Sequence, residues 1–395
     1  MTVSRDTRVN FALTFGLAGI GVVLGLVIPV MCRSRPSEQP VKAPSDQLAG
    51  EALEGAGGYL YRLAGYGPVM GSDVSLSAVF PNQRDPRAKA AFEKALAAAL
   101  GLEKRITKYE PESEVRRAWG LAPGQSFQVS EDTFRAIELS KELWSRSGGA
   151  FDCTVQPLIE LYKYTGKEER PPTDRELAEA RARVGSEALI LDREKRTVAF
   201  AAAGMKIDLG AVGQGLGTDL ACGALREAGA TSALVELGGE VRAFGRKLPG
   251  KPWSVAIVHP RAPGRTMATV ELDGNAVSTS GDYQKFFKSG GRRASHLLDP
   301  RTGKPLVGGA VSVTIIAPEC ILADGLATAV SVLGPAEGLK LVESYRAEGG
   351  RAEGKTVEAL IIEETADGKL VPHFSPGLAG KLKVELEVPG AAPAK

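Results

Sequence analysis

The sequence predicts an α+β fold, and three features support this prediction. Amphipathic helical stretches and short apolar strands follow one another in irregular order, without the regular strand–helix–strand units of a doubly wound sheet. Residues 188–210 are typical of a hairpin with a charged turn at 192–196. No fixed-period repeat is visible, which argues against a solenoid or a propeller.

The N-terminal part is predicted to be a membrane anchor. Residues 11–31 carry no charge, and the run is about long enough to cross a bilayer as one helix. A cleaved signal peptide and a lipoprotein signal at Cys32 are the alternatives. The flank lacks a small-residue cleavage site, and Met31 stands where a lipoprotein needs a small residue. Arginines lie on both sides of the run, so charge alone barely specifies its orientation.

Composition indicates an ordinary globular protein behind this segment. The chain has 395 residues and a net charge of +2, with 43% hydrophobic and 24% charged residues. The near-neutral charge gives no support to a nucleic-acid partner. The stretch after the apolar run is rich in Pro, Ser, Glu and Ala, as in a tether. We therefore predict four parts: an anchor or signal segment at 1–32, a linker at 33–56, a globular domain at 57–387 and a flexible tail at 388–395.

Helices are predicted where apolar residues recur at helical spacing among strong helix formers. The stretch 131–147 shows the terminal signals well, with Glu131 and Asp132 in its first turn and Gly148 after its end. The predicted helices span residues 86–105, 131–147, 177–185, 213–229, 323–334 and 335–345.

Strands are predicted where short apolar or β-branched runs are bounded by turn residues. Beyond the hairpin they are SALVELGG, EVRAFG, WSVAIVHP, ATVELDG, AVSTSG, SHLLDP and AVSVTIIAP, in that order between residues 232 and 318. The cysteines Cys32, Cys153, Cys222 and Cys320 have no metal-binding or redox spacing, so we predict that they are buried as small apolar side chains.

A hard-oxygen pair is the first candidate for chemistry. The segment ADGLATA at 323–329 places Asp324 and Thr328 four residues apart, on one face of a helix. A carboxylate with a hydroxyl suits Mg²⁺ that also holds substrate phosphates. The structural alternative is that Asp324 caps the helix and Thr328 hydrogen-bonds back to the chain.

Two further motifs are candidates for nucleotide binding. IDLGAVGQG at 207–215 predicts a strand, a glycine turn and a helix start, where free N–H groups suit a phosphate, although its glycines do not match the dinucleotide fingerprint. In GGAFDCTVQPL at 148–158, Phe151 could stack on a ring and Asp152 could read a nucleotide edge. The alternative is a core Phe and a turn Asp.

A histidine is the candidate general base. His296 in SHLLDPRTG could take a proton from an attacking hydroxyl, because imidazole titrates near neutral pH. The alternative is a structural histidine in a strand. The other two, His259 and His373, are predicted to be ordinary surface residues.

The motifs together resemble a known family. In order they are MGS at 70–72, GGAFDCTVQPL at 148–158, IDLGAVGQG at 207–215, ELGGE at 236–240, STSGDYQ at 278–284, SHLLDPRTGKPL at 295–306 and ADGLATA at 323–329. In this order and at these spacings the chain resembles the FAD:protein FMN transferases, also called the ApbE family. The resemblance implies an ApbE-like mixed fold of antiparallel-rich sheets with flanking helices. It also implies a reaction that uses Mg²⁺ to move FMN from FAD onto a Thr or Ser hydroxyl of a partner protein.

The resemblance further implies the role of each site residue. Asp324, Thr328 and the backbone carbonyl of Ala211 would bind Mg²⁺, and His296 and Asp324 would be catalytic. FAD would be contacted by Met70, Tyr109, Ala150, Phe151, Asp152, Asp208, Gln214, Leu297 and Leu298. The chain departs from the family pattern at Gln214, where Lys is common, so that positive charge near the diphosphate is missing.

Three activities fit these residues. Transfer of FMN to a protein, with release of AMP, is the first. Mg²⁺-dependent hydrolysis of FAD to FMN and AMP would use the same residues, and a non-catalytic, membrane-anchored flavin-binding protein is the third. The resemblance implies that the target is a membrane electron-transport subunit and that the catalytic domain acts on the outer, periplasmic or extracellular, face of the cell membrane.

Overall fold

The structure is a computed structural model. It describes residues 48–53, 58–83, 85–167, 170–247, 250–282, 286–289, 292–295, 297–347 and 357–387, with the backbone alone at 164–167, 286–289 and 292–295. The predicted membrane segment 11–31, the predicted tail 388–395 and His296 lie outside the described residues.

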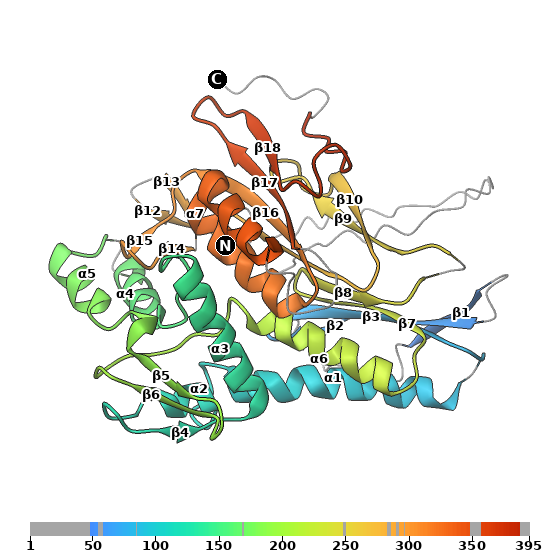
Figure 1. Cartoon of the computed structure of the whole chain (residues 1–395), viewed down its shortest axis with the longest axis horizontal. Coiled ribbons are helices and arrows are strands. Elements are labelled where there is room, and N and C mark those ends of the chain that lie inside the picture. The colour runs from blue at the N-terminus through green and yellow to red at the C-terminus, as the bar shows by residue number, and fades with distance from the viewer. Residues whose placement is uncertain are drawn as a thin grey trace, which may run out of the picture.

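One large antiparallel sheet organises the described chain (Figure 1). Every pair of neighbouring strands in it is antiparallel. In spatial order the strands are β1 (Ala49–Leu53), β2 (Gly58–Val69), β3 (Ser72–Phe80), β7 (Ser232–Leu237), β8 (Glu240–Phe244), β11 (Ala276–Gly281), β16 (Gly309–Ala317), β17 (Glu358–Glu364) and β18 (Leu370–Phe374). The predicted antiparallel-rich α+β fold is therefore confirmed.

Smaller strand groups surround this sheet. They are β4 (Phe127–Gln128) with β6 (Thr197–Phe200) and β5 (Leu189–Asp192), β9 (Trp253–Val258) with β10 (Thr266–Leu272), β12 (Phe286–Ser289) with β13 (Arg292–Ser295), and β14 (Leu298–Asp299) with β15 (Lys304–Pro305). The predicted strand SHLLDP is divided in the structure: Ser295 ends β13, Leu298–Asp299 form β14, and His296 lies outside the described residues.

The helices follow from their local sequence signals. Asp85 accepts a hydrogen bond from the backbone of Arg87 and Pro86 stands at the first position, so α1 begins where a cap and a preset φ are available. The helices are α1 (Pro86–Ile106), α2 (Glu114–Ala118), α3 (Glu131–Arg146), α4 (Gln156–Lys167), α5 (Asp174–Arg181), the 3-10 helix η2 (Ser186–Ala188), α6 (Gly213–Glu227) and α7 (Cys320–Ala347).

Helix α7 joins the two last predicted helices into one element with a kink. Gly334 has a φ of 76°, which only glycine adopts without strain, and Pro335 cannot continue the hydrogen-bonded ladder. In the described part of the chain, Cys320–Arg346 is the one helical segment long and apolar enough to span a membrane by these criteria alone. Its packing against β16, β11 and α6 accounts for its apolar composition.

The core lies on both faces of the large sheet. Helices α1 and α6 pack under β2, β3 and β7, and α7 packs beside them on β11, β16 and β17 (Figure 1). On the opposite face, β9 and β10 bury Trp253, Ile257 and Leu272 against the sheet. This arrangement places the N-termini of α6 and α7 next to each other.

Two expectations about side chains have different outcomes. Cys153, Cys222 and Cys320 are buried, as predicted. The prediction that His259 is an ordinary surface residue is wrong, because its side chain is 1% exposed and its Nε2 lies 3.0 Å from the backbone oxygen of Leu386. The backbone N–H of Arg261 donates to its Nδ1, so Nε2 is the protonated nitrogen and the ring ties two chain segments together.

Candidate functional site

A cavity of about 440 Å³ lies where α6, α7, β8 and the loop after β13 meet. It collects most of the predicted site residues from distant parts of the sequence. Those that line it are Tyr109, Ala150, Phe151, Asp152, Asp208, Ala211, Gln214, Leu297, Leu298, Asp324 and Thr328. Met70 lies next to it through its backbone oxygen, which is 3.4 Å from Gln214 Nε2.

Asp324 stands one turn into α7, where two helices come very close. Its Oδ2 accepts a hydrogen bond of 3.0 Å from the backbone N–H of Gly215 at the start of α6. A Cβ at Gly215 would lie 2.5 Å from the carbonyl oxygen of Cys320, so only glycine permits this approach. Thr328 follows on the same face of α7 and lines the same cavity. The alternative that Asp324 caps its own helix is not what the structure shows, because the cap comes from another residue.

That residue is Asp219 on α6. Its Oδ1 and Oδ2 accept hydrogen bonds from the backbone N–H groups of Cys320 and Ile321, at 2.9 and 3.0 Å. Asp219 is buried and is also ion-paired with Arg242 of β8. A negative side chain at a helix N-terminus is favourable, and here it fixes where α7 begins and hence where Asp324 and Thr328 lie.

Two buried carboxylates dominate the charge of the cavity. Asp324 and Glu240 are each 6% exposed and both line it. Burial raises the pKa of Asp324 to about 7, and the hydrogen bond from Gly215 only partly opposes this. Burial, and then the negative charge of Asp324, raise the pKa of Glu240 well above its ordinary value. Within the described residues neither carboxylate has a Lys, Arg or His at ion-pair distance.

The glycine turn before α6 positions the middle of the site. Asp208 is ion-paired with Lys108, and its Oδ1 accepts a hydrogen bond of 2.8 Å from the backbone N–H of Gly210. Gln214 donates through Nε2 to Ser72 Oγ at 2.9 Å. Gln214 is neutral, while Lys108 brings a positive charge to the cavity from another segment.

The segment 150–152 is held in the core. Ala150 and Phe151 are 1% and 2% exposed, and Phe151 belongs to the main apolar cluster, so its ring is mostly occupied by protein contacts. Both carboxylate oxygens of Asp152 accept hydrogen bonds from Thr154 and Ser186. Burial nevertheless raises the pKa of Asp152. Any ligand contact from this segment therefore comes largely from its backbone and from the edges of these side chains.

The rim is more open and carries positive charge. Tyr109 is 73% exposed, and the ammonium groups of Lys108 and Lys163 lie 5.9 and 5.8 Å from the centre of its ring. Leu297 and Leu298 line the opposite side, directly after His296, which lies outside the described residues. The structure therefore leaves the predicted role of His296 untested.

Three charged lining residues were not singled out from the sequence: Lys108, Lys163 and Glu240. Glu240 ends the motif ELGGE, and a carboxylate directly after two glycines was a signal that could have been followed. Gly238 has a φ of 70° and Gly239 a φ of 115°, so both glycines adopt conformations that other residues avoid. No comparable local signal marks the two lysines.

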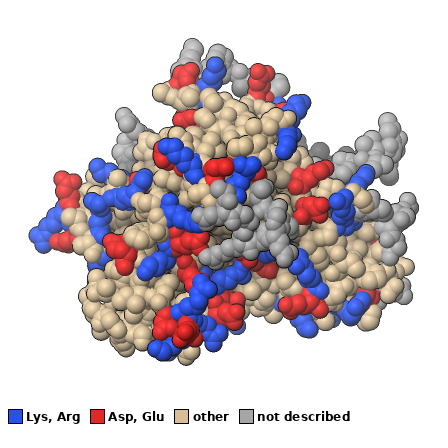
Figure 2. All heavy atoms as spheres, viewed as in Figure 1, with Lys and Arg blue, Asp and Glu red and all other residues tan. Residues whose placement is uncertain are grey.

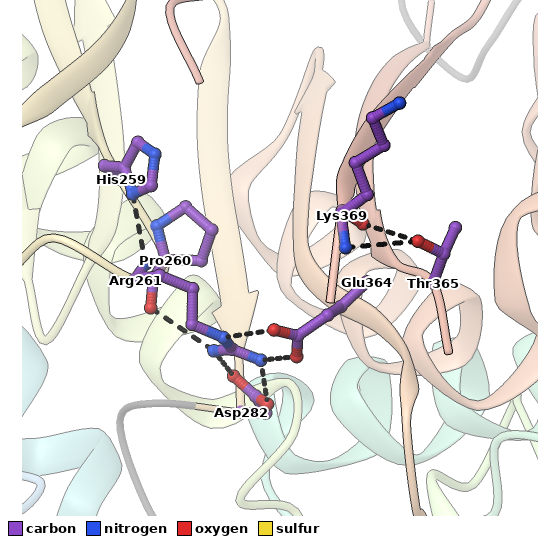
Figure 3. A network of polar contacts seen from close by, with 7 residues as sticks. All are labelled: His259, Pro260, Arg261, Asp282, Glu364, Thr365 and Lys369. Atoms are coloured by element: carbon purple, nitrogen blue, oxygen red, sulfur yellow. Dashed lines mark hydrogen bonds and ion pairs between the residues drawn. The ribbon is translucent and has the colours of Figure 1, made fainter. Parts of the chain in front are cut away.

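A second cavity of about 260 Å³ adjoins the first and shares Ser280, Gly281 and Leu297 with it. One wall is a network around Arg261 (Figure 3). Its guanidinium donates to both oxygens of Asp282, at 2.7 and 2.9 Å, and to both oxygens of Glu364, at 2.6 and 3.2 Å. These hydrogen bonds raise the pKa of Arg261. The loop before β10 is thereby tied to the ends of β11 and β17.

The residues of the main cavity fit a hydrated divalent cation. Among the described residues no group of three or more His, Cys, Asp or Glu side chains is arranged to enclose a metal. Mg²⁺ does not need such a group, since it usually binds one or two carboxylates together with waters and substrate phosphates. The buried Asp324, the hydroxyl of Thr328 and the carboxylate of Glu240 provide that kind of donor set, and Glu240 Oε2 has no hydrogen-bond partner within the described part of the chain.

The outer surface shows no single-sign area on the face drawn in Figure 2, where acidic and basic side chains are interspersed. This agrees with the small net charge of +2.

Comparison with known proteins places the chain in a family. The ApbE family model matches residues 70–350. A FAD:protein FMN transferase of Vibrio cholerae is 34% identical over 268 residues, which are 67% of this chain and 76% of that protein. Another, of Haemophilus influenzae, is 34% identical over 247 residues, 60% of this chain and 71% of that protein.

Solved structures agree with the sequence relatives. The apo form of the Pseudomonas stutzeri flavinyl transferase ApbE has a TM-score of 0.70 and 32% identity, and the match covers 81% of this chain and 96% of that chain. The flavin transferase ApbE from Vibrio cholerae has a TM-score of 0.69 and 30% identity, covering 82% and 99%. The predicted family is confirmed: this chain belongs to the ApbE family.

Proposed function

We propose that this protein transfers FMN from FAD to a Thr or Ser hydroxyl of a target protein, in a Mg²⁺-dependent reaction that releases AMP. One observation carries the proposal. In a member of a family whose relatives are named FAD:protein FMN transferases, a single cavity joins the predicted flavin contacts to a pair of buried carboxylates. A binding protein without turnover would have no need of that uncompensated pair.

The cavity residues suggest how FAD would be held. Tyr109 and the backbone of Ala150 and Phe151 would contact its ring systems. Lys108 and the N–H groups at the start of α6 would face the negative diphosphate. Asp208, held by Lys108 and Gly210, would keep the glycine turn in shape.

The same residues define a place for Mg²⁺. Asp324, Thr328 and the carbonyl of Ala211 would hold it. A bound Mg²⁺ would neutralise negative charge on the diphosphate as the transition state forms. Asp219 would act only through structure, because it fixes the start of α7 and is not among the residues that line the cavity.

The reaction moves one phosphoryl group. The acceptor hydroxyl oxygen would form a bond to the phosphorus on the FMN side of FAD. The bond from that phosphorus to the bridging oxygen would break, and AMP would leave with the bridging oxygen. His296 would take the hydroxyl proton and later return it to solvent or product.

The direct experiment incubates the purified full-length protein with FAD, MgCl₂ and a Thr-containing acceptor peptide, and measures intact masses. We expect a peptide heavier by one FMN residue and an equal amount of AMP. FMN and AMP with unmodified peptide would identify a FAD hydrolase. Unchanged FAD, bound but not consumed, would identify a flavin-binding protein.

His296→Ala tests the proposed base. Because a hydroxyl is a poor nucleophile until its proton is removed, we expect transfer to slow by about 10²–10⁴-fold. The affinity for FAD should change little, since phosphate, ring and metal contacts determine it. Transfer at the wild-type rate would remove His296 from the mechanism.

We further propose that residues 11–31 anchor the protein and that the catalytic domain acts on the outer face of the cell membrane, on a membrane electron-transport subunit. The proposal rests on the uncharged run and the family resemblance. Protease added to intact spheroplasts should cleave the domain while the anchor stays in the membrane fraction. A soluble mature chain that starts beyond Cys32, or a lipidated Cys32, would contradict the anchor.

A further inference from the structure

We infer that Glu240 is a second carboxylate ligand of the metal site and binds the divalent cation together with Asp324. The inference rests on the proposed function, since that function requires a cation in this cavity. It goes further by assigning the site a ligand outside the set of Asp324, Thr328 and Ala211. The Glu240 side chain is fully described, lines the cavity and is 6% exposed.

The backbone explains why Glu240 points to this place. It is the first residue of β8 and pairs with Leu237 across the turn made by Gly238 and Gly239. A Cβ at Gly238 would lie 2.5 Å from Gln214 Nε2, so the turn is pressed against the start of α6. The turn therefore delivers the Glu240 carboxylate to the junction of α6 and α7, where Asp324 lies.

Arg242, the next residue on the same face of β8, has an acidic partner within the protein. Residues two apart on a strand point to one side of the sheet, so Glu240 and Arg242 share a face. Arg242 is ion-paired with Asp219, which also receives two backbone N–H groups of α7. The charges of Arg242 and Asp219 therefore neutralise each other within the protein. Glu240 faces a second acid instead.

The Glu240 carboxylate is left incomplete by the protein. Its Oε1 is 3.4 Å from Ser278 Oγ, a long hydrogen bond, and its Oε2 is buried without any partner among the described residues. A buried carboxylate oxygen without a partner is costly, so such atoms commonly mark a position that a ligand completes. A positively charged ligand is expected at this position, because Asp324, a second buried acid, lines the same cavity.

The chemistry of Mg²⁺ agrees with two protein carboxylates. The ion prefers hard oxygen ligands in octahedral geometry and takes one or two carboxylates, with phosphate oxygens and waters at the remaining positions. Glu240 approaches from β8, while Asp324 and Thr328 approach from α7. Ligands from two sides would fix the ion relative to the diphosphate better than one helix face can.

The experiment measures metal binding itself, with Mn²⁺ as a spectroscopic probe. Free Mn²⁺ is followed by electron paramagnetic resonance during titration of the full-length protein, with and without ADP as an unreactive diphosphate. Glu240→Gln keeps the size of the side chain and removes the charge. Glu236→Gln is the matched control, because Glu236 is a neighbouring acid with a raised pKa that does not line the cavity.

We expect Glu240→Gln to weaken Mn²⁺ binding by about tenfold or more, in line with the loss of one ligand or its close support. Glu236→Gln should bind Mn²⁺ as the wild type does. Equal weakening in the two variants would show a general charge effect and overturn the inference. So would an unchanged affinity in Glu240→Gln, or a wild type that binds no Mn²⁺ with or without ADP.

Thermal unfolding of each variant without metal shows whether it is folded, and Glu240→Ala is a second variant if Glu240→Gln is not. The FMN-transfer assay is read separately. Glu240-dependent Mn²⁺ binding without transfer would keep the site and reject the proposed function. If the protein transfers FMN in a Mg²⁺-dependent reaction but Glu240→Gln binds Mn²⁺ as the wild type does, the proposed function stands and Glu240 is not a ligand.

Discussion

Two groups of buried or half-buried acids in this protein are treated in opposite ways. In the network around Arg261, one guanidinium donates to both oxygens of Asp282 and both oxygens of Glu364 (Figure 3). In the main cavity, Asp324 and Glu240 lie near each other, and no cationic side chain among the described residues pairs with either. Both groups lie beside the same strand, β11, and line adjoining cavities.

The difference separates charges that stabilise the fold from charges that we propose bind a cation. Breaking a closed ion-pair network leaves a charge without a partner and costs stability. Two uncompensated acids already cost stability in the folded state, so they are expected where function requires them. The Arg261 network thus stabilises the frame, and the acidic pair supplies the negative charge that a divalent cation would neutralise.

The largest expected effect comes from removing one member of the acidic pair. Asp324→Ala should lower the rate of FMN transfer by about 10³-fold or more, because a catalytic metal contributes several kcal/mol and 1.36 kcal/mol is a factor of ten. The metal-free variant should remain folded, with an unfolding midpoint no lower than that of the wild type. Unchanged transfer together with a lowered midpoint would show that Asp324 only supports the fold.

Breaking the network around Arg261 should lower stability and leave metal binding unchanged. Arg261→Ala leaves Asp282 and Glu364 without their shared cation, and the expected loss in the free energy of unfolding is about 2 kcal/mol, less than for a fully buried pair. Mn²⁺ affinity should stay as in the wild type. Urea unfolding measures the loss, with Arg175→Ala as control, since the Arg175–Glu179 pair has side chains 88% and 60% exposed. A loss no larger than in that control would contradict the comparison.

The pH dependence of the metal-free protein should expose the acidic pair. Because the pKa of Asp324 is raised from 3.8 to about 7, the folded state binds more protons than the unfolded state between these values. Stability should therefore fall as pH rises from about 4 to about 7. Glu240 adds to the same trend. Urea unfolding in EDTA should show a flatter profile for Asp324→Asn, and an identical profile would contradict the assignment.

The smallest expected effect is a change in FAD affinity, caused by a substitution at Lys108 on the rim of the cavity. Lys108 pairs with Asp208 and lines the cavity. Lys108→Met should weaken FAD binding about fivefold, as expected for one charge-assisted hydrogen bond. Fluorescence titration of FAD measures this, with Lys89→Met on the exposed face of α1 as control. Equal affinities in the two variants would remove Lys108 from the site.

Local signals in the sequence predicted much of the fold. Asp85 and Pro86 mark the start of α1, and the structure begins the helix there. The hairpin predicted at 188–210 is β5 and β6, with its turn at Arg193–Arg196. Helix α4 was not predicted, because QPLIELYKYTGK carries no capping signal and no acid in its first turn. The hairpin of β2 with β3, and the pair β17 with β18, were also missed.

The order of strands depends on contacts that no local pattern records. Strand β3 ends at Phe80 and pairs with β7, which starts at Ser232. The same holds for the site. The family motifs predicted a set of residues that the structure brings to one cavity, apart from Met70, which lies next to it, and His296, which lies outside the described residues. The role of Glu240 is inferred from the structure, in which its Oε2 has no hydrogen-bond partner among the described residues and Asp324 lies nearby.

The affinity of the wild-type protein for FAD, with and without Mg²⁺, tests the central claim most directly. Four acids and two lysines line the cavity: Asp152, Asp208, Glu240, Asp324, Lys108 and Lys163. A negative diphosphate should therefore bind poorly until a cation joins it. The account predicts that MgCl₂ tightens FAD binding by about tenfold or more, about 1.4 kcal/mol, and that Glu240→Gln shrinks this gain. Equal or weaker FAD binding in the presence of MgCl₂ would contradict it.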